Sequence, residues 1–274
     1  MDGRLSPALT QKDSGKKRMR NRTILKLGGS VITEKSAGSA GVIRYDALAA
    51  IAKSLALYPD MPLLIVHGAG SFGHPQAKAY HIQEGVTREN RKGIFETHQA
   101  VRELNTAVVE ALRSNGIEAV PIHPLHGCEA SDGKLVDPIF GHMDRMISLG
   151  LVPVIHGDVV MDRKRGACIV SGDQLIRVLA EGLRMDRVGL ATDVPGLLES
   201  DGSVVRELRR STVHQVTIGN SGHIDVTGGM EGKIAELLAL ADHGIRSEMF
   251  HISQFEAFLA GKDHGGTRIL PEDA

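Results

Sequence analysis

Short apolar runs alternate with amphipathic helical patterns along most of the chain. Runs of aliphatic residues predict strands at 23–27, 63–66, 117–122, 151–155, 168–170, 187–191 and 247–252. Apolar residues at helical spacing predict helices at 44–58, 88–114, 138–149, 171–183 and 232–243. This alternation indicates an α/β fold with a mostly parallel sheet covered on both faces. In such sheets, ligands bind beyond the carboxyl ends of the strands.

Turn and cap residues fix several of these boundaries. Asn115-Gly116 suits the end of the long helix, and Asp132-Gly133 and Arg165-Gly166 suit tight turns. Ser171 followed by Gln174 has the spacing of a capping box and predicts that a helix begins there.

Composition narrows the class of protein. The 274 residues suffice for one large domain or two tightly joined lobes, and the formal net charge of −1 argues against a nucleic-acid binder. We find neither an apolar run of roughly 20 residues, as a membrane span needs, nor a secretory signal. Two cysteines are too few for a disulfide framework, so we expect a cytoplasmic protein. Residues 1–22 are basic with little apolar periodicity and are expected to be a disordered, solvated tail ahead of a single domain at 23–270.

Three glycine-rich segments stand at strand ends or helix starts. They are Gly28-Gly29-Ser30, Gly68-Ala69-Gly70-Ser71-Phe72-Gly73 and Gly228-Gly229-Met230-Glu231-Gly232-Lys233. Glycine lets the backbone approach an anion closely, and the amides of a following helix start point at it. The three segments together predict phosphate binding.

Two common nucleotide motifs fit these segments poorly. The run from Gly29 to Ser36 nearly spells a P-loop, but Glu34 takes the place of the second glycine and would repel phosphate. The segment from Gly68 to Gly73 matches G-x-G-x-x-G, yet the strand-end acidic residue expected about 20 positions on is missing, because a helix is predicted there. A dinucleotide-dependent dehydrogenase is therefore an alternative that the glycine spacing supports and the missing acidic residue does not.

The combined motifs resemble the amino acid kinase superfamily and, within it, the isopentenyl phosphate kinases. The matching segments run in the family's order from Thr23 to Ile269: ILKLGGSVITEKS, IVHGAGSFGHP, VPVIHGDVV, VSGDQL, ATDVPGLL, DVTGGMEGK and GTRI. His74 is the most discriminating residue, because a histidine at that place is unusual in family members that phosphorylate carboxylates. The fosfomycin kinases, which act on a phosphonate, are the group most easily confused with this pattern.

The resemblance implies a three-layer α/β/α sandwich, ATP and Mg²⁺ as cofactors, and a homodimer. It implies an acceptor-binding lobe at about 23–160 and an ATP-binding lobe at about 161–270. Two departures stand out: Ala69 replaces a glycine of many members, and Pro195 replaces a usual aspartate. The alanine is tolerable if its φ is negative, whereas the proline removes a carboxylate from the turn before Gly196.

Four residues are expected to carry the phosphoryl transfer: Lys26, Asp173 and Lys233 on the charge-neutralising side, and His74 on the acceptor side. Lys26 lies between leucines in a buried strand and needs an anionic partner. Lys233 lies near a helix start, where the helix dipole disfavours a cation unless an anion is close. Asp173, next to a helix cap, could be an ordinary first-turn carboxylate. The resemblance implies that Lys26 neutralises the transferring phosphoryl group, that Lys233 binds the donor phosphates, and that Asp173 holds both lysines.

The remaining site assignments also follow from the resemblance. His74 and Lys35 are expected to bind the acceptor phosphate. The acceptor side further comprises Gly68, Ala69, Gly70, Gly73 and Gly157, and the nucleotide side comprises Lys26, Gly28, Gly29, Ser30, Thr192, Asp193, Gly196, Gly228, Gly229 and Lys233. Magnesium is expected to be held by ATP phosphates and water, so no residue is assigned as a metal ligand. The run His123-x-x-His126-x-Cys128 lacks the second pair of ligands that a structural zinc needs.

The motifs predict an ATP-dependent kinase that converts isopentenyl phosphate to its diphosphate. The partners are then an isoprenoid monophosphate and ATP, with neither nucleic acid nor membrane. A kinase of the same fold for a phosphonate, carboxylate or nucleotide is the nearest alternative. A non-catalytic nucleotide-binding regulator is the alternative from a different class.

Overall fold

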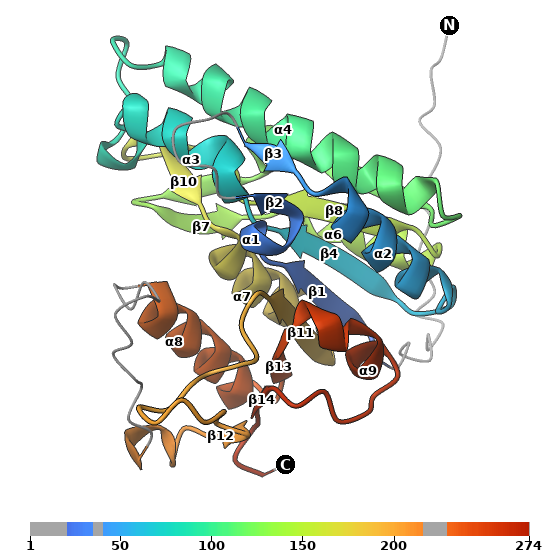
Figure 1. The fold of residues 1–274 in the computed structure, drawn as a ribbon. Helices are drawn as coiled ribbons and strands as arrows, with labels where there is room; N and C mark the ends of the chain where they lie inside the picture. The colour runs from blue at the N-terminus through green and yellow to red at the C-terminus, as the bar shows by residue number, and fades with distance from the viewer. Residues whose placement is uncertain (1–20, 35–40, 216–228, 274) are drawn as a thin grey trace, which may run out of the picture.

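The computed structural model describes residues 21–34, 41–215 and 229–273 (Figure 1). Its centre is an eight-stranded sheet in the order β12-β14-β13-β11-β1-β4-β8-β5. These strands are β1 (Thr23–Leu27), β4 (Leu63–His67), β5 (Ala119–Ile122), β8 (Val152–His156), β11 (Arg187–Thr192), β12 (Glu207–Leu208), β13 (Arg246–His251) and β14 (Thr267–Ile269). The six strands from β13 to β5 are mutually parallel, and β14 runs antiparallel to β13. The predicted mostly parallel sheet is confirmed.

Helices cover both faces of the sheet and make the predicted three-layer sandwich. They are α1 (Gly29–Ile32), α2 (Tyr45–Ala56), α3 (Gly70–Ala79), α4 (Lys92–Arg113), α5 (Pro124–Gly127), α6 (Phe140–Ser148), α7 (Gly172–Gly182), α8 (Gly229–Asp242) and α9 (Phe255–Leu259). Buried residues of α6, α7 and α8 pack on one face of the sheet. Buried residues of α1, α2, α4 and α9 pack on the other.

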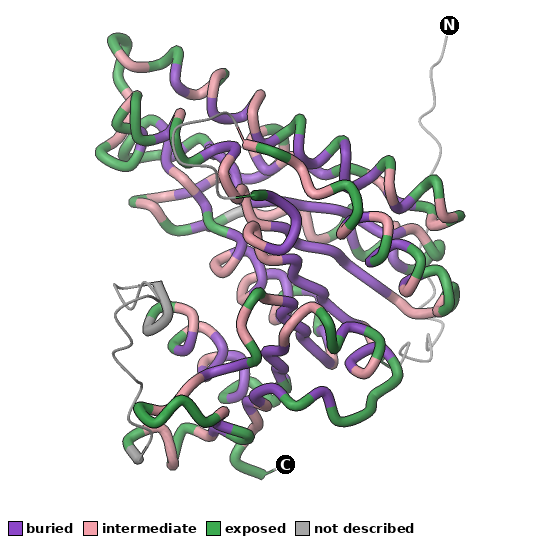
Figure 2. Tube along the Cα trace, in the orientation of Figure 1, coloured by how far each residue is buried: buried purple, intermediate pink, exposed green. Residues whose placement is uncertain are grey.

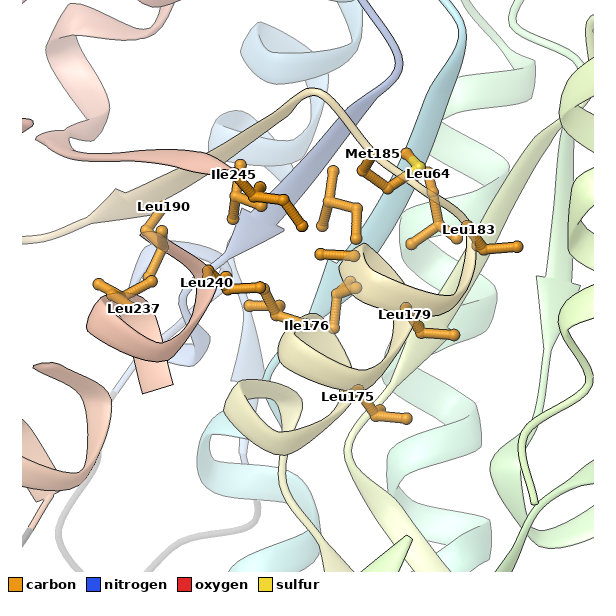
Figure 3. Packing of buried hydrophobic residues seen from close by; sticks show 14 of the residues in the cluster. Leu64, Leu175, Ile176, Leu179, Leu183, Met185, Leu190, Leu237, Leu240 and Ile245 are labelled. Carbon is orange, nitrogen blue, oxygen red and sulfur yellow. The ribbon is translucent and has the colours of Figure 1, made fainter. Parts of the chain in front are cut away.

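Strand alternation divides the core between these two layers. On β1, Ile24 joins the α7 layer, whereas Leu25 and Leu27 join the α4 layer. The buried residues, drawn in purple through the middle of Figure 2, follow the strands of the central sheet. In the α7 layer, Leu175, Ile176 and Leu179 of α7 belong to the same cluster as Leu64 of β4 and residues of α8 such as Leu240 (Figure 3). Aliphatic side chains dominate this packing because the chain has no tryptophan.

Most predicted elements are found, with shifted ends. The long helix begins at Lys92 rather than residue 88, and the last long helix begins at Gly229 rather than 232. Sequence patterning missed α3 and a second, four-stranded sheet in the order β10-β9-β6-β7. Its strands are β6 (Glu129–Ser131), β7 (Lys134–Asp137), β9 (Asp158–Asp162) and β10 (Gly166–Val170), of which only the last was expected. A short pair, β2 (Thr33–Glu34) and β3 (Val42–Ile43), completes the described strands.

The predicted turns are confirmed, whereas the capping box is only half correct. Asp132 and Gly133 both take left-handed φ values, 55° and 76°, between β6 and β7. Ser171 caps α7 by accepting a hydrogen bond of 3.2 Å from the Gln174 amide. The Gln174 side chain donates instead to the carbonyl of Gly133 at 3.1 Å. It therefore ties the start of α7 to the small sheet.

The tail predicted at the start of the chain remains a prediction. Residues 1–20 of the expected tail lie outside the described part of the chain. Arg22, at the end of that segment, pairs with Asp144 at 2.8 Å. Within the described residues, no helix is both long enough and apolar enough to cross a membrane.

Candidate active site

A cavity of about 560 Å³ opens where β1, β4, β8 and β11 reach their carboxyl ends. This is the position at which parallel sheets bind ligands. The structure brings most of the predicted site residues to it. The predicted residues that line the cavity are Lys26, Gly28, Gly29, Ser30, Gly68, Ala69, Gly70, Gly73, His74, Gly157, Asp173, Thr192, Asp193 and Lys233.

The first two glycine turns contact each other through their backbones. A Cβ atom on Gly29 would lie 2.5 Å from the Cα atom of Gly70, which leaves no room for a side chain. Gly70 has a φ of 54° and packs against Thr33, so it also needs to be glycine. The Thr33 hydroxyl donates to the Gly29 carbonyl at 2.8 Å and accepts a longer bond, 3.4 Å, from the Ser71 amide. Thr33 therefore links the two turns, and no sequence motif singled it out.

Ala69 fits the backbone of the second turn. Its φ is −68°, an ordinary value for alanine, so the expected tolerance of this departure is confirmed. Ala69 immediately precedes α3, which begins at Gly70. The amides of the first turn of α3 have no intrahelical acceptor and carry the positive end of the helix dipole. This part of the cavity therefore favours an anion.

Lys26 and Asp173 form a close ion pair across the cavity floor. The Lys26 Nζ atom lies 2.5 Å from Asp173 Oδ1. Strand alternation explains the contact, because Lys26 points to the same face as Ile24, where α7 begins. The predicted need of Lys26 for an anionic partner is thus met within the protein.

A second cation acts on the same lysine. Burial lowers the pKa of Lys26, the Asp173 carboxylate opposes that effect, and the nearby Lys233 ammonium lowers the pKa further. Lys233 lies in the second turn of α8 and also lines the cavity. Two lysines thus lie at one end of the cavity, close enough for the charge of Lys233 to disfavour the charge of Lys26. Such a site is suited to polyanions.

His74 lies one turn into α3. The helix begins at Gly70, four residues before His74, and the His74 side chain is exposed at the cavity. Beside it, Ala77, Val101 and Ile169 give the cavity an apolar wall. The close approach of Gly73 to Val101 holds α3 against α4 along this wall. The cavity therefore joins a polar, cationic region to an apolar one.

The predicted nucleotide residues are only partly gathered at the cavity. The Thr192 hydroxyl lies 2.8 Å from the Val194 carbonyl and 3.1 Å from that of Phe250, so it is engaged in turn contacts. Asp193 is exposed at the cavity, whereas Gly196 does not line it and packs against Thr267. Gly229 begins α8. Lys35 and Gly228 lie outside the described residues.

Sequence reasoning missed a cluster of buried polar residues behind the glycine turns. His67 ends β4 and His156 ends β8. From α4, Asn105 hydrogen-bonds to His67, and His98 hydrogen-bonds to Asp158. The available signal was the pair of His-Gly dipeptides, 67–68 and 156–157, each at the end of a predicted strand. His123 and His126 lie beside His98 in this cluster. Across the described residues, no group of three or more His, Cys, Asp or Glu side chains is arranged to hold a metal ion.

Residues 21–251 match the family model described as the amino acid kinase family. The chain belongs to this family.

Within the family, the chain is similar to isopentenyl phosphate kinases, as its motifs predicted. The isopentenyl phosphate kinase of Haloferax volcanii is 40% identical over 244 residues, which cover 88% of this chain and 96% of the relative. That of Methanothermobacter thermautotrophicus is 38% identical over 261 residues, which cover 90% and 98%. An X-ray structure of isopentenyl phosphate kinase, 36% identical, superposes with a TM-score of 0.78 and covers 90% of this chain and 99% of that one.

Proposed function

We propose that this protein transfers the γ-phosphoryl group of ATP to isopentenyl phosphate and so makes isopentenyl diphosphate. The observation that carries the proposal is that one cavity combines two kinds of lining. One part holds Lys26, Asp173, Lys233 and two glycine turns, and the other part has an apolar wall beside His74. The cationic part suits phosphates, and the apolar part suits a short hydrocarbon tail. The similarity to isopentenyl phosphate kinases along almost the whole chain supports the same acceptor.

The reaction makes modest demands on acid–base chemistry. An oxygen of the acceptor phosphate forms a bond to the γ-phosphorus, and the bond from that phosphorus to the β,γ-bridging oxygen breaks, releasing ADP. Catalysis of such transfers is mostly positioning and charge neutralisation. Because a phosphate monoester is already ionised near neutral pH, its oxygen attacks without a strong general base.

The lysine cluster supplies the charge neutralisation in this proposal. Lys26 donates to the oxygens of the transferring phosphoryl group, and Lys233 binds the phosphates of the donor. Asp173 keeps both ammonium groups from separating, which fixes their position before ATP arrives. Positive groups held in place in this way stabilise developing charge without reorganisation.

His74 and the glycine turns hold the acceptor. His74 donates a charge-assisted hydrogen bond to the acceptor phosphate. The amides at the start of α3 and the peptides of Gly68 and Gly157 border the same region. Lys35 would assist His74. The tail then lies along Ala77, Val101 and Ile169, away from the charges.

The cavity fits a magnesium ion that the nucleotide itself carries. Among the described residues, the carboxylates that line the cavity are Asp158, Asp173 and Asp193. Asp158 is hydrogen-bonded to His98, and Asp173 is hydrogen-bonded to Lys26. This donor set suits an ion held by ATP phosphates and water, with Asp193 free to bond one of those waters. When bound, magnesium supplies further neutralisation of the phosphate charge.

An acceptor panel tests the proposal. Purified protein, ATP and magnesium are mixed in turn with isopentenyl phosphate, fosfomycin, N-acetylglutamate and a nucleoside monophosphate, and ADP release is followed by a coupled assay. We expect kcat/KM for isopentenyl phosphate to exceed that for every other acceptor by at least about a hundredfold, since binding differences of a few kcal/mol separate such groups. A higher value for another acceptor would assign the chain to that kinase activity. Tight ATP binding with no ADP formed on any acceptor would indicate a regulator.

Three coarser features belong to the same proposal. We expect the acceptor to bind residues of about 23–160 and ATP those of about 161–270, a homodimer in solution, and a cytoplasmic location. The acceptor glycines Gly68 and Gly157 lie in the first part, and Thr192, Asp193 and Lys233 lie in the second. Light scattering after gel filtration measures the oligomeric state, and a mass of one chain, 29.4 kDa, would contradict the dimer.

A further inference from the structure

Two buried histidines stand side by side behind the acceptor end of the cavity. His67 ends β4 and His156 ends β8, and the two residues are paired in register between these neighbouring parallel strands. Both side chains are fully buried, and their rings stack with centroids 5.3 Å apart and planes inclined by 28°. Each histidine is followed by a glycine, Gly68 or Gly157, that lines the cavity.

Hydrogen bonds fix the protonated nitrogen of each ring. Nδ1 of His67 lies 3.0 Å from the Gly68 carbonyl oxygen, and Nδ1 of His156 lies 3.1 Å from that of Gly157. A carbonyl oxygen only accepts hydrogen bonds, so both Nδ1 atoms must carry a proton. Burial lowers the pKa of His67 to about 4 and that of His156 to about 3, so both rings are neutral near pH 7. Their Nε2 atoms are therefore acceptors.

Each Nε2 atom receives a hydrogen bond from a donor suited to it. The Asn105 amide nitrogen lies 3.0 Å from Nε2 of His67, and Nδ1 of His123 lies 2.9 Å from Nε2 of His156. The result is two parallel relays, from Asn105 through His67 to Gly68 and from His123 through His156 to Gly157. The face of α4 that carries Asn105 also carries His98, two turns earlier, which bonds Asp158 at 2.8 Å.

The relays end on peptide groups that border the cavity. In a trans peptide the C=O and N–H bonds point in opposite directions. Holding the Gly68 carbonyl on a histidine ring therefore turns the Ala69 amide away from that ring, and the same holds for Gly157 and the Asp158 amide. All four residues line the cavity. Glycine has little intrinsic preference for one peptide orientation, so an external bond has most to contribute here.

A purely structural role accounts poorly for this arrangement. Fully buried polar rings cost free energy unless they are hydrogen-bonded, and aliphatic residues fill the same layer elsewhere on β4 and β8. The burial of Asn105 adds to this cost, since its Oδ1 atom has no hydrogen-bond partner in the part of the chain that the structure describes. Metal binding is also a poor account, because the Nε2 lone pairs already accept hydrogen bonds.

We propose that His67 and His156 are positioning residues, which use Nδ1–H to fix the Gly68 and Gly157 peptides in the orientation that binds the acceptor phosphate. The proposal rests on the function proposed above, in which these glycines hold the acceptor. Asn105 and His123 select the tautomer that each ring needs. Neither histidine contacts the substrate.

Matched amide substitutions separate this role from a structural one. In His67→Asn, the side-chain amide nitrogen stands as many bonds from the backbone as Nδ1 and can still donate to the Gly68 carbonyl. In His67→Gln, the amide nitrogen stands in the place of Nε2 instead. Both variants lose the ring and should lose similar thermal stability. The pair His156→Asn and His156→Gln repeats the test at Gly157.

We expect the acceptor KM to separate the members of each pair. The asparagine variants should keep an acceptor KM within about threefold of wild type, whereas the glutamine variants should raise it on the order of tenfold, the scale of one lost hydrogen bond. The KM for ATP should stay unchanged in all four. Equal acceptor KM values within both pairs, or losses that simply follow melting temperature, would overturn the proposal. If one pair does not fold, the other pair carries the same test.

Spectroscopy on the wild-type protein gives an independent readout. Long-range ¹H–¹⁵N correlation spectra near pH 7 should show His67 and His156 as neutral rings protonated at Nδ1. Protonation at Nε2 in either ring would overturn the proposal for that ring. The wild-type acceptor panel reveals failure of the proposed function before any variant is made. Failure of the positioning role alone leaves wild-type turnover intact and shows only in these variants and spectra.

Discussion

Lys26 occupies a position where a buried strand would ordinarily carry an aliphatic residue. Its Nζ atom pairs with Asp173, and its exposed fraction is only 8%. Replacing it by methionine keeps the length and suits the surrounding core, so the fold should survive. The transferring phosphoryl group would lose one fixed positive charge, and we expect kcat to fall on the order of 10²–10³.

The measurement is steady-state turnover together with a thermal melt. Lys53→Met, at an exposed position near the end of α2, is the matched control and should leave kcat unchanged. A kcat of Lys26→Met within a few-fold of wild type, in a folded protein, would remove Lys26 from the catalytic group.

His74 is expected to act on the acceptor alone. The His74→Ala variant should raise the acceptor KM and lower kcat, because the acceptor phosphate loses a charge-assisted hydrogen bond, while the KM for ATP stays similar. His81→Ala, an exposed histidine that pairs with Glu84, serves as the control. An unchanged acceptor KM and kcat would contradict the role of His74.

At the scale of elements, the two glycine turns depend on each other. In Gly29→Ala the new methyl group would meet the backbone of Gly70, so α1 and α3 must move apart. We expect a loss of roughly 1–3 kcal/mol in the free energy of unfolding, the usual cost of overpacking. Turnover should fall further than stability alone explains, because both turns border the phosphate region.

Gly141→Ala is the matched control for this substitution. Gly141 lies in α6, and a Cβ atom there would meet nothing within 4 Å. Alanine is favoured over glycine inside helices by about 1 kcal/mol, so this variant should be as stable as wild type or slightly more so. Urea unfolding of both variants makes the comparison. Equal stability of Gly29→Ala and wild type would contradict the tight contact between the turns.

The main elements could be predicted because their patterns are local. The runs at β1 and β4 are continuous and aliphatic, and α2 keeps its apolar residues at helical spacing. The small sheet was not predicted, because its strands are short and pair with distant segments, as β6 pairs with β9. The α3 helix was not predicted, because its glycines and proline are typical of turns rather than helices.

The candidate site divides in the same way. Glycines, Lys26 and Asp173 carry local or family motifs, so their approach to one cavity was expected. Contacts that depend on packing between layers were not. Thr33 bonds a turn formed by residues nearly 40 positions later, and Asn105 reaches His67 only because α4 crosses β4 on the face where His67 points. Such contacts are set by tertiary packing, which no short sequence window contains.

At the scale of the whole molecule, the two buried histidines make folding depend on pH. Their pKa values in the folded protein, about 4 for His67 and about 3 for His156, lie below the value of about 6.5 expected for the unfolded chain. Between those limits the unfolded chain binds more protons than the folded one. The free energy of unfolding should therefore fall as pH decreases below about 6.5.

Urea unfolding near pH 7 and near pH 5 measures this dependence. At pH 5 each histidine contributes a loss of about 2 kcal/mol, on the scale of 1.36 kcal/mol per pKa unit, so the pair should lower stability on the order of 4 kcal/mol. The low-pKa carboxylate of Glu248 loses its contribution only as pH falls through the carboxylate range, nearer pH 4, so it does not confuse the comparison. His81→Ala should keep the full effect, because that ring is exposed. A free energy of unfolding that stays constant between pH 7 and pH 5 would mean that the two rings take up protons in the folded protein as readily as in the unfolded chain. That result would contradict the neutral rings inferred from their carbonyl and donor contacts.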